Sequence, residues 1–147
     1  MARLIANLHA LMESGSEAVA AYEVAIERIG NFRHRHKLSE FFADHQRHIH
    51  RVSGWVTRLG AQPDKGLSRR LITRARVLLS YVIGGDRGIL DALRMNEALL
   101  SERYNKAMSE DAISPDLRKL LRQCLEDIQR HRAWLAVELH RDDRKAA

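Results

Sequence analysis

Apolar residues in the segment 38–59 recur with the period of an α-helix, but two histidines interrupt the apolar face. At about 100° per residue, one face collects Leu38, Phe41, His45, Val52, Val56 and Leu59, with His48 and Trp55 at its edge. A face directed at a protein core is normally apolar, so two imidazoles on it require partners. The segment therefore predicts a buried helix whose histidines serve a polar network, a metal site or proton transfer.

Three further segments show the same helical period, and no segment has the alternation typical of a strand. They cover about residues 3–29, 87–109 and 115–140. The chain has 147 residues with only two prolines and eight glycines, which leaves little turn material for a sheet. We therefore expect an all-α fold with a single domain over residues 1–140 and a charged, frayed tail over residues 141–147.

The spacing of the segments predicts two antiparallel helical hairpins joined by a long connection. Gly30 and Asn31 end the first segment close to the start of the second, and a short turn at 110–114 joins the last two. Between the hairpins, residues 67–83 predict a short basic crossover helix, which Gly84 and Gly85 end. Two hairpins with a connection of this length are typical of a four-helix bundle.

The two hairpins repeat the same inward positions. In the first helix of each hairpin, a tyrosine lies seven positions after an inward residue that is not a large apolar one. The pairs are Gly15 with Tyr22 and Glu97 with Tyr104. Glu97 stands in the middle of an otherwise apolar stripe. The second helix of each hairpin then carries an inward histidine. Four polar side chains are thus expected to meet inside the bundle: His45, His48, Glu97 and His131.

This layout resembles the ferritin-like superfamily, in particular a small bacterial subgroup with an extra crossover helix. The resemblance covers about residues 4–140. It is carried by the late tyrosine of the first helix, Gly60 twelve residues after His48, Gly84-Gly85-Asp86, and Asn96-Glu97 followed by Tyr104. In the superfamily's di-metal proteins, two helices each supply a Glu and the other two each supply a Glu-x-x-His. In this chain, Glu97 matches the glutamate of one of the first two helices, and Gly15 replaces the glutamate of the other. His48 and His131 match the two histidines of the Glu-x-x-His motifs. The glutamates of those motifs are replaced by His45 and Ile128.

The resemblance implies a degenerate di-metal site in a stress-related or metal-related protein. Two adjacent cations need bridging carboxylates to offset their repulsion, and Glu97 alone cannot supply them. His45, His48, Glu97 and His131 instead form a reasonable ligand set for one Fe, Zn or Mn ion, with Tyr22 and Tyr104 as hydrogen-bonding partners. The alternative is a non-enzymatic structural or interaction bundle with a metal-free polar core that satisfies its own hydrogen bonds. The residues leave both possibilities open, and they leave open whether the protein is an enzyme.

Charge and composition give weaker indications about partners. The formal net charge is +6, but the basic residues are spread along the chain, which favours a solvated surface. Binding of nucleic acid or an acidic membrane would use the crossover arginines, Arg69, Arg70, Arg74 and Arg76. Trp55 and Trp134 lie at the edges of their apolar stripes. They are expected to pack at the rim of the core, or alternatively to anchor an interface in a homo-oligomer or with a protein partner. The single cysteine, Cys124, and the lack of a long apolar run predict a cytoplasmic protein without a transmembrane segment.

Overall fold

The computed structural model describes residues 1–63, 74–75 and 83–146, and these form four long helices without any strand. The helices are α1 (Ala2–Arg28), α2 (Phe32–Arg58), α4 (Gly85–Met108) and α5 (Pro115–Ala146). The predicted all-α four-helix bundle is confirmed. Two boundaries differ, because α2 begins at Phe32 instead of near Leu38 and α5 continues to Ala146 instead of ending near His140. No Gly or Pro follows His140, and an ion pair between Glu138 and Arg141 supports the helix there.

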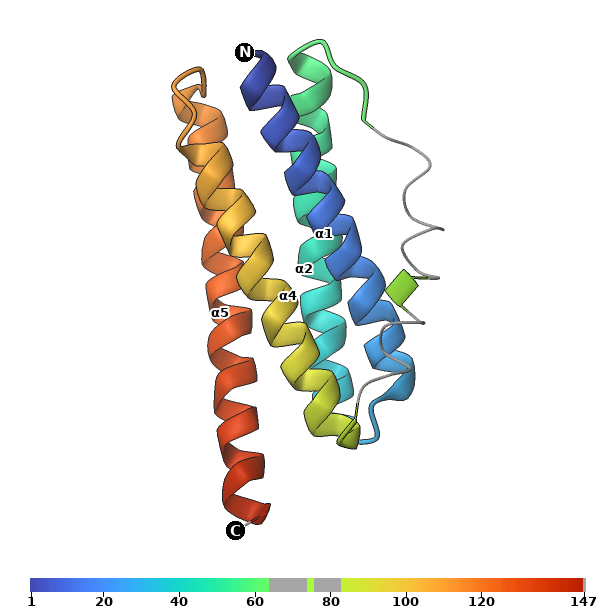
Figure 1. Ribbon diagram of the computed structural model, residues 1–147. Helices are drawn as coiled ribbons and strands as arrows, with labels where there is room; N and C mark the ends of the chain where they lie inside the picture. The colour runs from blue at the N-terminus through green and yellow to red at the C-terminus, as the bar shows by residue number, and fades with distance from the viewer. Residues whose placement is uncertain (64–73, 76–82, 147) are drawn as a thin grey trace.

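The helices pack as two hairpins side by side. α1 contacts α2 and α4, and α5 contacts α4 and α2. α1 and α5 run in one direction and α2 and α4 in the other, so the chain leaves α2 at one end and enters α4 at the opposite end (Figure 1). The predicted crossover helix, with Arg69, Arg70 and Arg76, lies outside the described residues. Arg74, which is described, is helical and forms an ion pair with Glu17 of α1.

The core consists of two apolar clusters with a polar layer between them. One cluster includes Leu8, Val56 and Leu121, and the other includes Leu38 and Leu90. Along α2, α4 and α5, the residues between the two clusters are the inward His45, Glu97 and His131. The bundle therefore places these three buried polar side chains at mid-height, between apolar residues on both sides.

The turn between α1 and α2 is fastened to the start of α4. Asp86 accepts hydrogen bonds from the backbone N–H groups of Gly30 and Asn31, both at 2.8 Å. The N-cap of α4 is Gly84, whose φ of 100° suits glycine. Asn31 caps α2 by accepting from the N–H groups of Arg33 and His34. This tether fixes the axial position of α2 relative to α4.

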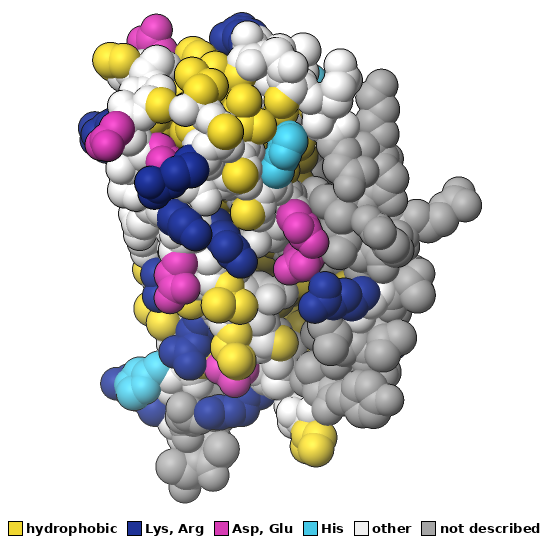
Figure 2. Space-filling view, turned by 45° about the horizontal axis from the view of Figure 1, so that its top comes forward, with side chains coloured by type: hydrophobic (Ala, Val, Ile, Leu, Met, Phe, Trp, Pro, Cys, Tyr) yellow, Lys and Arg dark blue, Asp and Glu magenta, His cyan; other side chains and the backbone are white. Residues whose placement is uncertain are grey.

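The surface carries charges of both signs. On the face shown in Figure 2, Lys and Arg side chains lie among acidic and hydrophobic side chains. None of the helices in the described ranges combines the length and the apolar character that crossing a membrane requires.

Candidate metal site in the polar layer

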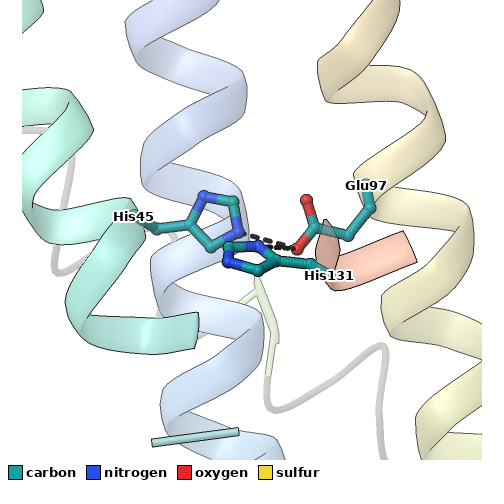
Figure 3. Close-up of side chains that lie close together, drawn as sticks. All are labelled: His45, Glu97 and His131. Carbon is teal, nitrogen blue, oxygen red and sulfur yellow. Dashed lines mark hydrogen bonds and ion pairs between the residues drawn. The ribbon is translucent and has the colours of Figure 1, made fainter. Parts of the chain in front are cut away.

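Three helices each bring one polar side chain to the same point inside the bundle. These are His45 from α2, Glu97 from α4 and His131 from α5, each at most 1% exposed to solvent (Figure 3). Each occupies a position of its helix where the apolar stripe faces the core. One ligand-type atom from each residue lies within 4.8 Å of the other two, so the group could hold a metal ion.

The carboxylate of Glu97 is the hydrogen-bond acceptor at the centre of the group. Its Oε1 accepts from the Tyr22 hydroxyl at 2.6 Å, lies 2.8 Å from Nε2 of His45 and lies 3.0 Å from Nδ1 of His131. Its Oε2 is buried and has no hydrogen-bond partner. A carboxylate with three donors on one oxygen and none on the other keeps the lone pairs of its second oxygen available inside the core.

The neighbouring groups keep Glu97 ionised. Burial alone would raise its pKa, but the imidazoles of His45 and His131 outweigh burial and lower the pKa to about 2. Burial, together with the Glu97 charge, raises the pKa of the Tyr22 phenol well above its usual value. Near neutral pH the layer therefore holds a carboxylate, with Tyr22 protonated and donating to it.

His131 links the buried carboxylate to a second one at the bundle surface. Its Nε2 lies 2.8 Å from Oδ2 of Asp44, whose side chain is 21% exposed, while its Nδ1 faces Glu97. Each ring nitrogen of His131 therefore lies within hydrogen-bond distance of a carboxylate oxygen. Burial tends to raise the pKa of Asp44, but hydrogen bonds from His131 and Arg47 lower it overall. The chain Glu97–His131–Asp44 thus connects the interior to the surface.

His48 does not join the group around Glu97. Its Nε2 donates to Oδ2 of Asp127 at 2.8 Å, and its Nδ1 is buried without a partner. Burial lowers the pKa of His48 to about 4, although the Asp127 charge opposes this. His48 is therefore neutral near pH 7, with the proton on Nε2. Of the four predicted site residues, the structure gathers three and pairs the fourth with a different carboxylate.

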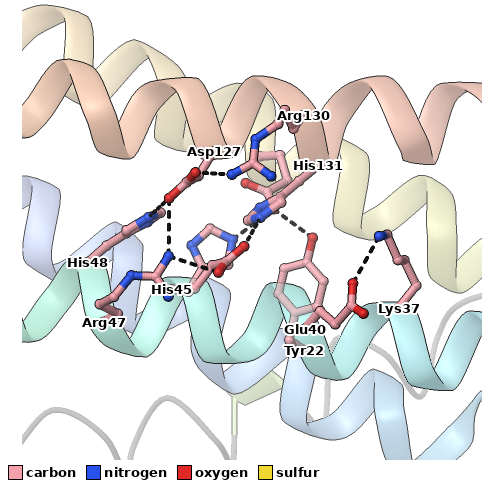
Figure 4. A network of polar contacts seen from close by, with 11 residues as sticks. Tyr22, Lys37, Glu40, His45, Arg47, His48, Asp127, Arg130 and His131 are labelled. Atoms are coloured by element: carbon pink, nitrogen blue, oxygen red, sulfur yellow. Dashed lines mark hydrogen bonds and ion pairs between the residues drawn. The ribbon is translucent and has the colours of Figure 1, made fainter.

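Asp44 and Asp127 are functional-site neighbours that the apolar stripes do not predict, because both lie off those stripes. The signal that identifies them is a repeated pattern, D-x-Q-R-H, at residues 44–48 and 127–131. Each pattern places Asp and His four residues apart on one side of a helix. Because α2 and α5 are antiparallel, the patterns pair reciprocally. Asp44 pairs with His131, and His48 pairs with Asp127 (Figure 4). Arg47 bridges the two aspartates, at 2.9 Å and 3.3 Å.

The other residues of the expected set are divided between the site and the core. Tyr22 binds Glu97, as expected of a hydrogen-bonding partner. Tyr104 instead belongs to the apolar cluster and lies beside Cys124, whose burial raises its thiol pKa to about 11. At Gly15, an added Cβ would lie 3.2 Å from Cγ1 of Ile49. Gly15 takes the position in the first hairpin that Glu97 takes in the second. Packing of Ile49 closes the space there, so it holds no second carboxylate.

Comparisons with protein-family models, with curated proteins and with solved structures find no match to this chain. The chemistry of the polar layer therefore carries the functional conclusion.

Proposed function

We propose that this chain is a ferritin-like protein that binds one transition-metal ion, Fe, Zn or Mn, at His45, Glu97 and His131. The observation that carries the proposal is the convergence of two imidazole nitrogens and one carboxylate oxygen within 4.8 Å in the buried core. Two histidines and one glutamate are a protein ligand set that such ions use when one position stays open.

The surrounding hydrogen bonds support this ligand set. A metal ion would take the place of the protons between Glu97 and the two imidazoles, so binding would release protons. Nε2 of His131 would keep its hydrogen bond to Asp44. A carboxylate behind a ligating imidazole orients the ring and raises its basicity, as is usual for histidine ligands. The free Oε2 of Glu97 offers a second oxygen to the ion.

The same residues argue for one ion instead of two. Gly15 and Ile128 stand where the family resemblance would require carboxylates, so Glu97 is the only buried carboxylate at the centre among the residues that the structure describes. Because one carboxylate cannot offset the repulsion of two adjacent cations, the site supports a mononuclear centre. A bound ion would supply Lewis-acid or redox chemistry, in keeping with a metal-related or stress-related role.

The test is metal content after reconstitution. Protein stripped with a chelator is incubated with Zn(II), Mn(II) or, without oxygen, Fe(II), then desalted and analysed for metal. We expect about one equivalent per chain, with release of protons to an indicator dye. His131→Asn and His45→Asn should each lose the ion. His48→Asn is the matched control, because it removes a buried histidine that pairs with Asp127, outside the ligand group. Wild-type protein that stays metal-free would refute the proposal, as would a loss confined to His48→Asn.

A second candidate function is a structural or interaction bundle with a metal-free polar core. It is favoured by the hydrogen bonds to Oε1 of Glu97, which Tyr22, His45 and His131 provide without an ion. In that case the polar layer would fix the register of the helices, since any axial slip would leave buried charges without partners. The decisive comparison is again metal content. Metal-free protein in which Glu97→Leu loses stability would favour this function.

A further inference from the structure

A second candidate site lies away from the polar layer, in a groove between the C-terminal half of α2 and the N-terminal half of α5. The groove has a volume of about 540 Å³. Its lining includes Arg51, Gly54, Trp55 and Arg58 from α2 and Asp116 and Lys119 from α5. This volume is within the range of about 300–1,000 Å³ that is typical of small-molecule sites.

The groove concentrates positive charge that the protein itself does not neutralise. Arg51, Arg58 and Lys119 face a single carboxylate, Asp116, and within the described ranges none of the three cations forms an ion pair. Elsewhere on the same helices, Arg47 and Arg130 both pair with Asp127. Cations left without carboxylates at the wall of a groove are suited to a ligand that brings negative charge.

An aromatic ring lies among these cations. The guanidinium of Arg58 sits over the ring of Trp55, 5.2 Å from its centroid, and Trp55 is only partly buried. Arg51 donates to Oε1 of Gln123, which holds its guanidinium across the groove toward α5. A partly exposed indole beside a guanidinium can stack on a planar ring, and the guanidiniums of the groove can bind phosphate oxygens.

Gly54 keeps the groove open. It lies within α2, where glycine is among the poorest helix formers, and a Cβ added there would meet nothing within 4 Å. Packing of the bundle therefore does not require glycine at this position. Because glycine has no side chain, the surface of α2 beside Trp55 stays open to the groove.

From these observations we propose that the groove binds a nucleoside phosphate, with its base stacked on Trp55 and its phosphates held by Arg51, Arg58 and Lys119. A compact ligand fits better than an extended strand, because the lining cations gather at one groove and Asp116 lies among them. The site is independent of the metal ligands, which belong to the buried layer.

The proposal is tested by fluorescence titration. The chain has two tryptophans, and Trp134→Phe leaves Trp55 as the only indole. ADP should quench this fluorescence saturably, and adenosine and inorganic phosphate should each bind roughly tenfold more weakly or worse. Lys119→Ala and Arg51→Ala should each weaken ADP binding roughly tenfold. Gly54→Leu should abolish binding, and the variant should stay folded, because leucine favours the helix and a Cβ at this position meets no neighbour.

Arg122→Ala is the matched control, because Arg122 is an exposed cation of α5 that does not line the groove. It should leave ADP binding unchanged. Absence of saturable quenching would overturn the proposal, and so would an equal loss in Arg122→Ala, which would indicate general charge attraction. Inorganic phosphate that binds as tightly as ADP would remove the base-stacking role of Trp55. An oligonucleotide that binds much more tightly than ADP would replace the nucleotide with nucleic acid as the ligand.

Discussion

His48 makes the stability of the bundle depend on pH over a range where carboxylates do not yet titrate. Its pKa is about 4 in the folded protein, against an ordinary value of 6.5. As the pH falls below 6.5, the unfolded chain takes up a proton that folded His48 refuses, because burial penalises the charged ring. The stabilisation is therefore complete above about pH 6.5 and is lost progressively down to about pH 4.

The size of this effect follows from the two pKa values. The difference between 6.5 and about 4 corresponds to a maximum of about 3 kcal/mol. Most of it, about 2 kcal/mol, should be lost between about pH 7.5 and about pH 5. Over that interval Glu97, whose pKa is about 2, stays ionised in the folded protein. The lowered pKa values of Asp44 and Asp127 likewise keep these two groups ionised.

The assay is urea unfolding of chelator-treated protein, followed by circular dichroism, for wild type and His48→Gln. The amide of Gln can still donate to Asp127 but cannot take up a proton. The free energy of unfolding of the variant should fall by about 2 kcal/mol less than that of wild type over the same pH interval. If both proteins lose the same amount, the buried, neutral state assigned to His48 is incorrect.

Three further outcomes are expected from the same structure. Glu97→Leu should lower the free energy of unfolding by about 3–5 kcal/mol, because Tyr22, His45 and His131 lose their acceptor. Glu97→Gln keeps an oxygen at this position and should cost less. Equal losses of the two variants in urea unfolding would contradict this. Asp86→Ala should lower the free energy of unfolding by about 1–2 kcal/mol, since the N–H groups of Gly30 and Asn31 lose their acceptor. An unchanged melting temperature would show that this tether does not stabilise the bundle. Cys124 should resist a thiol reagent at about pH 8 until the protein is unfolded, because it is buried and its pKa is about 11; rapid labelling of the folded protein would contradict its placement.

The sequence by itself determined the helices and the side of each that faces inward. Apolar residues at helical spacing identify four amphipathic segments, and the rotation of about 100° per residue fixes the angle of every side chain about its axis. His45, Glu97 and His131 are therefore predictable as buried polar residues. The long connection between the hairpins similarly predicts that α2 and α4 run in the same direction.

Only the tertiary structure decided which carboxylate each histidine meets. That choice depends on the axial offset between helices, and helical periodicity contains no information about it. The offset is set by distant contacts, such as the Asp86 tether at one end of the bundle and the close packing of Gly15 on Ile49 at its middle. With this offset, antiparallel α2 and α5 bring His48 to Asp127, while His45 reaches Glu97.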